Sequence, residues 1–199
     1  MKPSAKLTKD DFHLPTFALN LKRGGPATTH PKDCGLVLAY CGVGREFKVL
    51  ELGCGSGYMT VQFARICNSV VSYEKRKEFL ALAQENVRRN KLDNVRFAHK
   101  DVLEGITEEP ESFDLAFVDI AEADKVAGVA HGLLKNGGYL VGHCLQFEQA
   151  KLLQLEMKKS FREVWSAESI VREYEAREFG FRPKHFGITY TAVMVFGRK

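Results

Sequence analysis

The stretch Val49-Leu-Glu-Leu-Gly-Cys-Gly-Ser-Gly-Tyr58 decides the fold of this chain. A short apolar run containing Glu51 is followed by three glycines at alternate positions, Gly53, Gly55 and Gly57. Glycine is favoured where the backbone turns tightly or approaches a ligand without a side chain between them. The pattern therefore predicts a buried strand, a ligand-binding loop and the start of a helix.

The rest of the chain repeats this alternation of strand and helix. Apolar stripes at helical spacing separate the predicted strands, and one of these stripes is Phe147, Ala150, Leu153 and Met157. Pro31 suits the first position of an earlier helix, and Asn136–Gly138 suits the end of a later one. The segments rich in β-branched and aromatic residues are 48–52, 69–74, 95–100, 113–119, 138–144 and 191–197, with a seventh strand within 161–171.

Regular alternation of this kind predicts a Rossmann-like, doubly wound α/β fold. We expect a mostly parallel, seven-stranded sheet with helices on both faces. The last two strands have no long helix between them, so we expect them to form an antiparallel edge hairpin. In such sheets the ligand binds at the carboxyl ends of the strands.

Composition narrows the class of protein. The 199 residues are 45% hydrophobic and 27% charged, which is typical of a globular chain. No apolar run is long enough to cross a bilayer and no signal sequence is visible, so we expect a cytoplasmic protein. The five cysteines are scattered and form no CxxC pair, and the six histidines show no ligand-like spacing, so no metal site is predicted.

Charge is distributed unevenly along the chain. Residues 1–32 carry six Lys or Arg against two acids, and residues 151–199 carry ten against six, whereas residues 33–150 carry 13 against 17. Basic flanks of this kind suit an anionic partner such as nucleic acid. Solvated basic surfaces would explain the same bias.

The residues around the glycines indicate which cofactor they hold. Glu74 ends the second predicted strand, where a carboxylate can accept hydrogen bonds from both hydroxyls of a ribose. A dinucleotide fingerprint would place its third glycine at the position of Tyr58. Glu51 would also repel a pyrophosphate, but its charge suits a positively charged sulfonium.

With Asp101 after the third strand and LKNGG before the fifth, residues 48–144 resemble the Rossmann-like S-adenosylmethionine (SAM) methyltransferases. The resemblance implies SAM as the cofactor and a methyltransferase domain over residues 31–199, after an N-terminal extension over residues 1–30. It implies the following cofactor-binding residues: Glu51, Gly53, Gly55, Ser56, Gly57, Glu74, Asp101, Val102 and Asp119. An alternative role for Asp101 is to cap the turn that follows it.

Asp119 ends the fourth predicted strand, which would lie beside the glycine loop and face the transferred methyl group. Methyl transfer is an in-line displacement, so the nucleophile must be held close to the methyl group. A carboxylate there could hydrogen-bond an amine next to a ring nitrogen and stabilise the positive charge that develops on the ring. We therefore predict Asp119 as the catalytic residue, with helix capping as the alternative.

A closer resemblance covers about residues 22–199. The segment Lys22-Arg-Gly-Gly-Pro-Ala-Thr-Thr-His-Pro-Lys-Asp33, the segment Arg172-Glu-Tyr-Glu-Ala-Arg177 and the closing TYTAVMVFGRK resemble tRNA (adenine-N1) methyltransferases of the T-loop type. The resemblance implies a tRNA substrate and a homo-oligomer, a tetramer. It also implies that Asp119 binds the target adenine, that Arg172 and Arg177 contact phosphate, and that Tyr190 lies near the base pocket.

The chain departs from this family at two places. The family usually carries a small β-rich N-terminal domain that docks tRNA, and here about 20 residues precede the similarity. The family's Asp-x-x-x-Pro-Trp pattern corresponds to Asp119-Ile-Ala-Glu-Ala-Asp124, without the proline or the tryptophan. Both departures concern the acceptor and leave the cofactor motif intact.

Two other functions remain open at this stage. The segment 25–32 is also similar to small-molecule methyltransferases of the corrinoid pathway, although these usually have a glycine pair after strand four, where this chain has Asp119-Ile120. A SAM-binding subunit without catalysis is the third possibility. Such a subunit would be expected to have lost its glycine loop or its strand-four acid, and both are present here.

Overall fold

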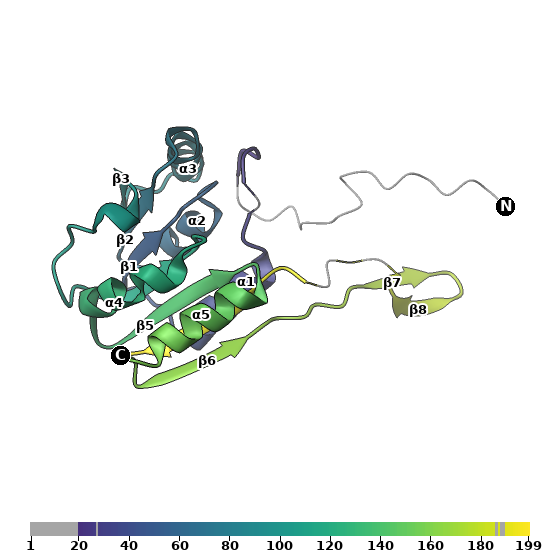
Figure 1. The fold of residues 1–199 in the computed structure, drawn as a ribbon. Helices are drawn as coiled ribbons and strands as arrows, with labels where there is room; N and C mark the ends of the chain where they lie inside the picture. Colours follow the sequence, from purple (N-terminus) through teal and green to yellow (C-terminus); the bar gives the residue numbers. More distant parts are fainter. Residues whose placement is uncertain (1–19, 27, 186, 188–189) are drawn as a thin grey trace.

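A computed structural model describes residues 20–26, 28–185, 187 and 190–199 (Figure 1). Its centre is one seven-stranded sheet in the order β3-β2-β1-β4-β5-β9-β6. The strands of this sheet are β1 (Lys48–Leu52), β2 (Ser69–Glu74), β3 (Val95–His99), β4 (Phe113–Val118), β5 (Leu134–Cys144), β6 (Glu163–Ala167) and β9 (Val193–Arg198). The predicted Rossmann-like, mostly parallel sheet is confirmed.

Helices cover both faces of the sheet. They are α1 (Pro31–Tyr40), α2 (Tyr58–Ala64), α3 (Lys77–Arg89), α4 (Ala123–Leu133) and α5 (Phe147–Met157), with a short 3₁₀ helix η1 (Val102–Glu104). The core on one face joins α4 and α5 to the sheet, and the core on the other joins α1 and α2. As predicted, Pro31 begins α1, where its missing N–H costs no helical hydrogen bond.

The strand order fixes where a ligand can bind. β1 pairs in parallel with β2 on one side and with β4 on the other. The order in which the chain adds strands to the sheet therefore reverses between β1 and β4. The helices that follow β1 and β4 therefore leave the sheet on opposite faces and open a crevice between them. The loop after β1 and the residue that ends β4 both lie at this crevice.

Two details of the C-terminal half differ from the sequence prediction. β5 begins at Leu134, four residues earlier than expected, and Asn136-Gly137 lies inside the strand rather than at a helix end. A register shift opposite Phe113 and Leu115 accommodates the positive φ of Gly137. The expected antiparallel pair does form, but β9 lies between β5 and β6, so only β6 of the pair lies at an edge of the sheet.

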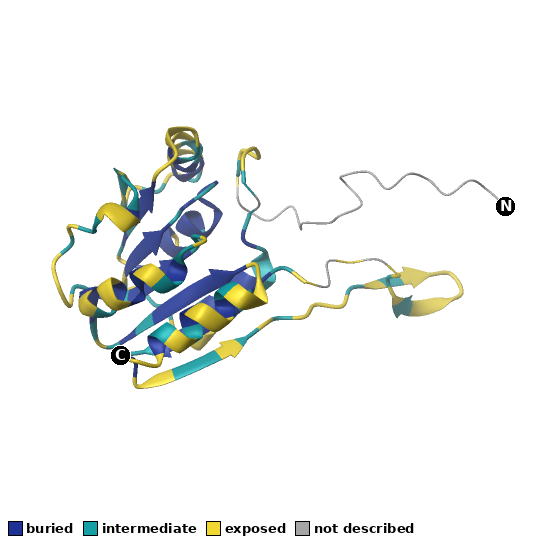
Figure 2. Ribbon diagram, in the orientation of Figure 1, coloured by how far each residue is buried: buried dark blue, intermediate teal, exposed yellow. Residues whose placement is uncertain are grey.

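An arm that the sequence analysis did not predict separates β6 from β9. It consists of β7 (Tyr174–Arg177) and β8 (Gly180–Pro183), which form their own two-stranded antiparallel sheet. The arm projects from the body and is largely exposed, whereas the central strands are buried (Figures 1 and 2). Stacking of Tyr174 on Phe181 and the ion pair of Arg182 with Glu175 hold its two strands together, and Arg177 pairs with the same Glu175 within β7.

All five cysteines are buried free thiols. In the part of the chain that the structure describes, no helix is long and apolar enough to cross a membrane. Residues 1–19, most of the expected N-terminal extension, lie outside the described residues.

Candidate functional site

The glycine loop follows β1 and needs glycine for two reasons. Gly53, Gly55 and Gly57 all have positive φ, which side chains disfavour. A Cβ atom at Gly53 would overlap the backbone carbonyl of Asp119, and one at Gly57 would lie 2.7 Å from the Cα atom of Ala83 on α3. The loop is therefore pressed between β4 and α3, which brings it to the crevice.

Glu74 ends β2 directly beside this loop. Its Oε2 accepts a hydrogen bond from the N–H of Gly55 at 3.0 Å, and its Oε1 accepts from both the backbone N–H and the Nε of Arg76 at 3.0 Å. Burial acts to raise the pKa of Glu74, but these donors outweigh it and hold the pKa below its usual range. A buried, ionised carboxylate is thus fixed at the edge of the loop.

Asp101 and Val102 follow β3 at the same edge of the sheet. One oxygen of Asp101 accepts the N–H of Leu103 at 3.0 Å, so the expected capping role is real. Its other oxygen pairs with Lys75 at 3.3 Å. Val102 is buried behind this turn.

Glu51 lies behind the glycine loop rather than in a cavity wall. It is fully buried, and its Oε2 accepts hydrogen bonds from Thr60 and Ser72, each at 2.6 Å. Burial raises the pKa of Glu51 to about 7, although the two hydrogen bonds act to lower it. Its Oε1 has no hydrogen-bond partner among the described residues. A cationic ligand on the other side of the loop would stabilise this carboxylate, so the site fits a sulfonium or an ammonium group.

Two cavities flank the end of β4. The first, of about 460 Å³, is lined by residues that include Tyr73, Glu74, Lys75, Asp101, Val102, Leu103, Gln146 and Gln149. The second, of about 470 Å³, is lined by residues that include Pro26, Thr28, Thr29, His30, Cys54, Gly55, Ser56, Tyr58 and Thr191. Both cavities share Gly53, Arg76, Asp119, His143 and Leu145. A ligand that fills the first cavity can therefore present a group to a second molecule at Asp119.

Asp119 is paired with a histidine at this junction. Its Oδ1 lies 3.2 Å from Nδ1 of His143, which is the second-to-last residue of β5. Burial disfavours the protonated imidazole, but the hydrogen bond and the charge of Asp119 outweigh this effect and raise the pKa of His143. No described residue hydrogen-bonds Oδ2 of Asp119, so this oxygen is available to a ligand.

Sequence reasoning missed His143, Arg76 and Leu145. His143 was part of a predicted strand, where a histidine has no distinguishing pattern. The parallel pairing of β4 with β5 aligns Val118 with Gly142, and this register places His143 next to Asp119. The available signal was its place near the carboxyl end of the predicted strand 138–144, since ligands bind at the carboxyl ends of the strands in such sheets.

The start of α1 contacts one wall of the second cavity, because Lys32 and Asp33 bond Thr191, which lines this cavity. Lys32 and Asp33 form a buried ion pair of 2.8 Å, and both bond Thr191 at 2.6 Å, which ties α1 to the segment before β9. Ser56 is buried, and its carbonyl accepts from Asn86 on α3 at 2.8 Å. The predicted cofactor residues are thus gathered around one crevice, with Glu51 behind it.

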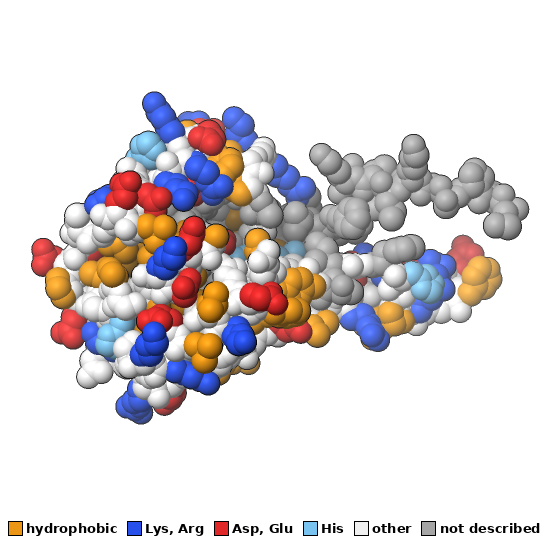
Figure 3. Space-filling model, viewed as in Figure 1, with side chains coloured by type: hydrophobic (Ala, Val, Ile, Leu, Met, Phe, Trp, Pro, Cys, Tyr) orange, Lys and Arg blue, Asp and Glu red, His pale blue; other side chains and the backbone are white. Residues whose placement is uncertain are grey.

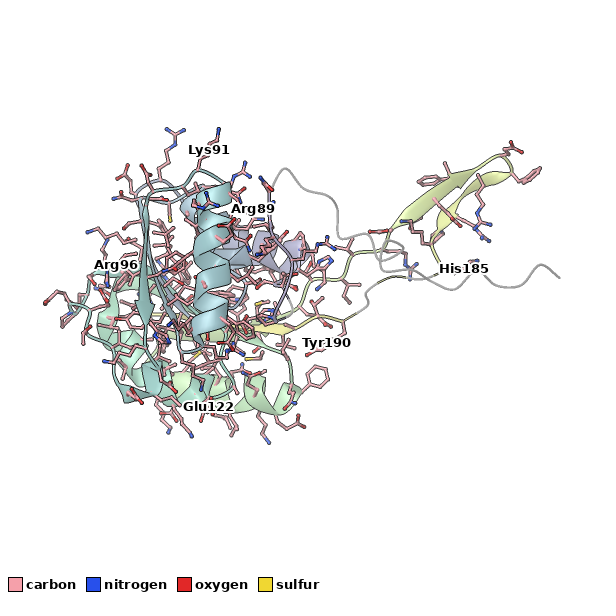
Figure 4. All side chains as sticks on the ribbon, turned by 90° about the horizontal axis from the view of Figure 1, so that it is seen from above. Arg89, Lys91, Arg96, Glu122, His185 and Tyr190 are labelled. Atoms are coloured by element: carbon pink, nitrogen blue, oxygen red, sulfur yellow. The ribbon has the colours of Figure 1, made fainter. Side chains whose placement is uncertain are left out.

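The three predicted substrate residues lie apart from each other. Arg177 is on the arm in an ion pair with Glu175, and Arg172 lies in the connection that leads to the arm. Neither lines either of the two cavities described above. Tyr190 lies where the arm joins the body (Figure 4), and its hydroxyl donates to the carbonyl of Leu145 at 2.9 Å. No group of three or more potential metal ligands occurs among the described residues.

Comparisons with known proteins agree with this geometry. The profile of the family described as "Methyltransferase domain" matches residues 44–188. The chain is 32% identical over 195 residues to the tRNA (adenine(58)-N(1))-methyltransferase TrmI of Thermus thermophilus, covering 94% of this chain and 76% of that protein.

Solved structures give the same result. The chain resembles the tRNA (m1A58) methyltransferase TrmI of Aquifex aeolicus with a TM-score of 0.84 and 27% identity, covering 90% of this chain and 72% of that one. A precorrin 8w decarboxylase of Methanobacterium thermoautotrophicum matches with a TM-score of 0.77 at 19% identity, over 90% and 96% of the two chains, which shows a common fold alone. The chain belongs to the SAM-dependent methyltransferases, in the family that contains the TrmI enzymes.

Proposed function

We propose that this protein transfers the methyl group of SAM to N1 of an adenine in tRNA. The observation that carries the proposal is the free Oδ2 of Asp119 at the junction of the two cavities. The 32% identity to a tRNA adenine methyltransferase, in an alignment that covers 94% of the chain, supports the choice of acceptor. SAM supplies an electrophilic methyl group on a sulfonium.

The first cavity suits the nucleoside part of the cofactor. Glu74 would bind the ribose hydroxyls, since its carboxylate is ionised and reaches the cavity. Asp101 and Val102 would flank the adenine ring. The backbone of residues 53–57 would hold the aminoalkyl part, with Ser56 on the side of the second cavity and the charge of Glu51 behind the loop.

Asp119 would act on the acceptor base. Its Oδ2 can accept a hydrogen bond from an exocyclic amine next to the reacting ring nitrogen, which orients the ring and increases the electron density on that nitrogen. Methylation leaves the ring positively charged, and the carboxylate stabilises this charge. His143 donates to Oδ1 and so fixes the direction of the carboxylate.

A basic surface near the second cavity suits the phosphates of an RNA. Hydrogen bonds between the backbone of Lys22 and the side chain of Asn86 hold the lead-in segment against α3. This places Lys22 and Arg23 beside the basic end of α3, where Arg89 and Lys91 project (Figure 4). Arg177 on the arm has a carboxylate partner already, so Arg172 is the freer of the two cations proposed for phosphate contact.

We also propose that the protein works in the cytoplasm as a homo-oligomer, a tetramer. The arm supports this, because it exposes apolar rings among mixed charges (Figure 3), and Phe179 at its tip is 98% exposed. Surfaces of this kind usually mark contacts with another protein. Native mass spectrometry measures the state directly, and a monomer at working concentration would contradict this part of the proposal.

Nucleoside mass spectrometry tests the reaction itself. Unmodified tRNA is incubated with the protein and isotope-labelled SAM, and labelled N1-methyladenosine is the expected product. A different methylated nucleoside would keep RNA as the substrate and overturn the adenine assignment. No label in RNA, with SAM still bound in a parallel titration, would contradict the proposal and favour a small-molecule acceptor.

A further inference from the structure

Two exposed aromatic side chains stand together beside the cavities. Phe147 begins α5 and belongs to the apolar stripe that also contains Ala150, Leu153 and Met157. Those three residues are buried, whereas Phe147 is 67% exposed. The first residue of α5 lies beyond the edge of the core because the helix starts past the carboxyl end of β5.

The partner of Phe147 comes from a distant part of the chain. Tyr190, in the segment that returns from the arm to β9, is 39% exposed, and its ring centroid lies 5.6 Å from that of Phe147 at an interplanar angle of 56°. This angle leaves the faces of the two rings unstacked on each other. Both rings also keep exposed surface.

The aromatic pair is fixed to the catalytic end of β5. The hydroxyl of Tyr190 donates to the carbonyl of Leu145 at 2.9 Å, and Leu145 lines both cavities. Leu145 lies two residues after His143, the partner of Asp119. The side chain of Gln149, two residues after Phe147, donates to the carbonyl of Ile120 at 2.7 Å and so ties α5 to the loop after Asp119.

We propose that Phe147 and Tyr190 form a stacking platform that receives the acceptor base after it turns out of the RNA strand. The inference rests on the proposed function and adds the residues that select a flat heteroaromatic ring. Bases turned out for chemistry are held between aromatic or apolar side chains while their edges are read by hydrogen bonds. Here the platform supplies the stacking surface, and Asp119 supplies the acceptor for the base edge.

The first test compares Phe147→Ala with Phe147→Trp. We expect Phe147→Ala to raise KM for tRNA by roughly 10-fold to 100-fold, the range expected when one base loses its aromatic partner. Phe147→Trp should restore KM to within about threefold of the wild type, because tryptophan also stacks. Leu152→Ala is the matched control, since Leu152 lies on the same helix and is 55% exposed. SAM affinity, measured by calorimetry, should not change in any of the three.

A second test needs no turnover, so it separates failure of the platform from failure of the proposed function. An RNA oligonucleotide with 2-aminopurine at the target position changes its fluorescence when that base unstacks and rebinds to protein. We expect a saturable change with the wild type and Phe147→Trp, and a right-shifted curve with Phe147→Ala.

Three results would overturn the platform. One is equal KM and equal fluorescence titration for Phe147→Ala and the wild type. Another is an equal loss with Phe147→Trp, which would indicate a requirement for the exact packing of phenylalanine. The third is a change of mass in native mass spectrometry for Phe147→Ala but not for Leu152→Ala, which would show that a second copy covers these rings.

Discussion

The two ends of the sheet build their parts of the site in different ways. On the β1–β3 side, each proposed cofactor residue directly follows its own strand: the glycine loop follows β1, Glu74 ends β2, and Asp101 follows β3. On the β5–β9 side, His143, Phe147 and Tyr190 come from three segments that meet only in the folded chain. The cofactor half is thus a set of local sequence motifs, whereas the acceptor half is a product of tertiary contacts.

This difference has a chemical counterpart. In the cofactor half the carboxylates of Glu74 and Asp101 are held by backbone N–H groups and by Arg76 and Lys75. The acceptor half ends in exposed aromatic rings and in one carboxylate oxygen without a described partner. A fixed half suits a cofactor that is the same in every cycle, and an open half suits a large substrate that must enter and leave.

The largest expected effect is on turnover and concerns the junction between the halves. Asp119→Asn should lower kcat by about 10²–10³-fold, because the amide cannot stabilise positive charge on the acceptor as a carboxylate does. SAM affinity should change far less. Rapid-quench or steady-state assays with labelled SAM measure the first quantity, and calorimetry measures the second.

Asp124→Asn is the matched control for this variant, since Asp124 lies in the first turn of α4 and lines neither cavity. It should keep wild-type turnover. Equal turnover of Asp119→Asn and the wild type would remove Asp119 from catalysis and, with it, the proposed division between the two halves.

The second effect concerns the rigidity of the cofactor half. Gly53→Ala should destabilise the fold by roughly 2 kcal/mol or more, because the alanine must adopt a left-handed φ and its Cβ atom overlaps the carbonyl of Asp119. SAM binding should weaken as well. Denaturant unfolding and calorimetry measure both.

Gly132→Ala provides the opposite case, since a Cβ atom at this position of α4 meets nothing within 4 Å. It should stabilise the protein by roughly 0.5–1 kcal/mol, the usual gain from replacing glycine in a helix. If both alanine variants had the same stability, the close approach of the loop to β4 would be of no energetic importance.

A third prediction concerns SAM binding by Glu74, the last residue of β2. Glu74→Gln should weaken SAM binding by roughly 10-fold, since hydrogen bonds to a charged group contribute about 1.5–3 kcal/mol. The kcat at saturating SAM should remain close to the wild-type value, because Glu74 is proposed to hold the ribose and not the acceptor base. Glu78→Gln, at an exposed position of the following helix, is the control. A loss of kcat without a loss of affinity would place Glu74 in the acceptor half instead.

The smallest effect is a shift of one pKa. Burial lowers the pKa of His143, but Asp119 raises it by a larger amount, so the pKa lies above the usual 6.5. In Asp119→Asn the burial effect remains, with the smaller and opposing effects of Asp33 and Lys32, so the pKa of His143 should fall. NMR titration of the imidazole Cε1–H resonance measures both values.

The raised pKa of His143 makes the stability of the folded protein depend on pH. The folded protein binds the His143 proton more tightly than the unfolded chain, so the pair contributes its full stability below pH 6.5 and loses it as pH rises through the folded pKa. Asp119→Asn should not show this loss. Identical stability profiles from pH 6 to pH 9 would mean that the two side chains do not interact in solution.

The sequence by itself determined the cofactor half. Alternating strands and helices predicted the parallel sheet, and the spacing of Gly53, Gly55 and Gly57 after a buried strand predicted the loop. The positions of Glu74, Asp101 and Asp119 at strand ends were enough to place them at one edge, because parallel strands all end at the same edge. Each of these signals lies within a few residues of the strand that it follows.

The tertiary structure alone decided the acceptor half. Strand order put β9 inside the sheet, and this arrangement brought Tyr190 to Leu145 across 45 positions of sequence. The register of β4 on β5 paired His143 with Asp119. Phe147 fits the periodicity of a core residue, and it is exposed only because α5 begins beyond the sheet that covers the rest of the helix. Periodicity reports which residues share a face, but which of them find a neighbour depends on where the other elements end.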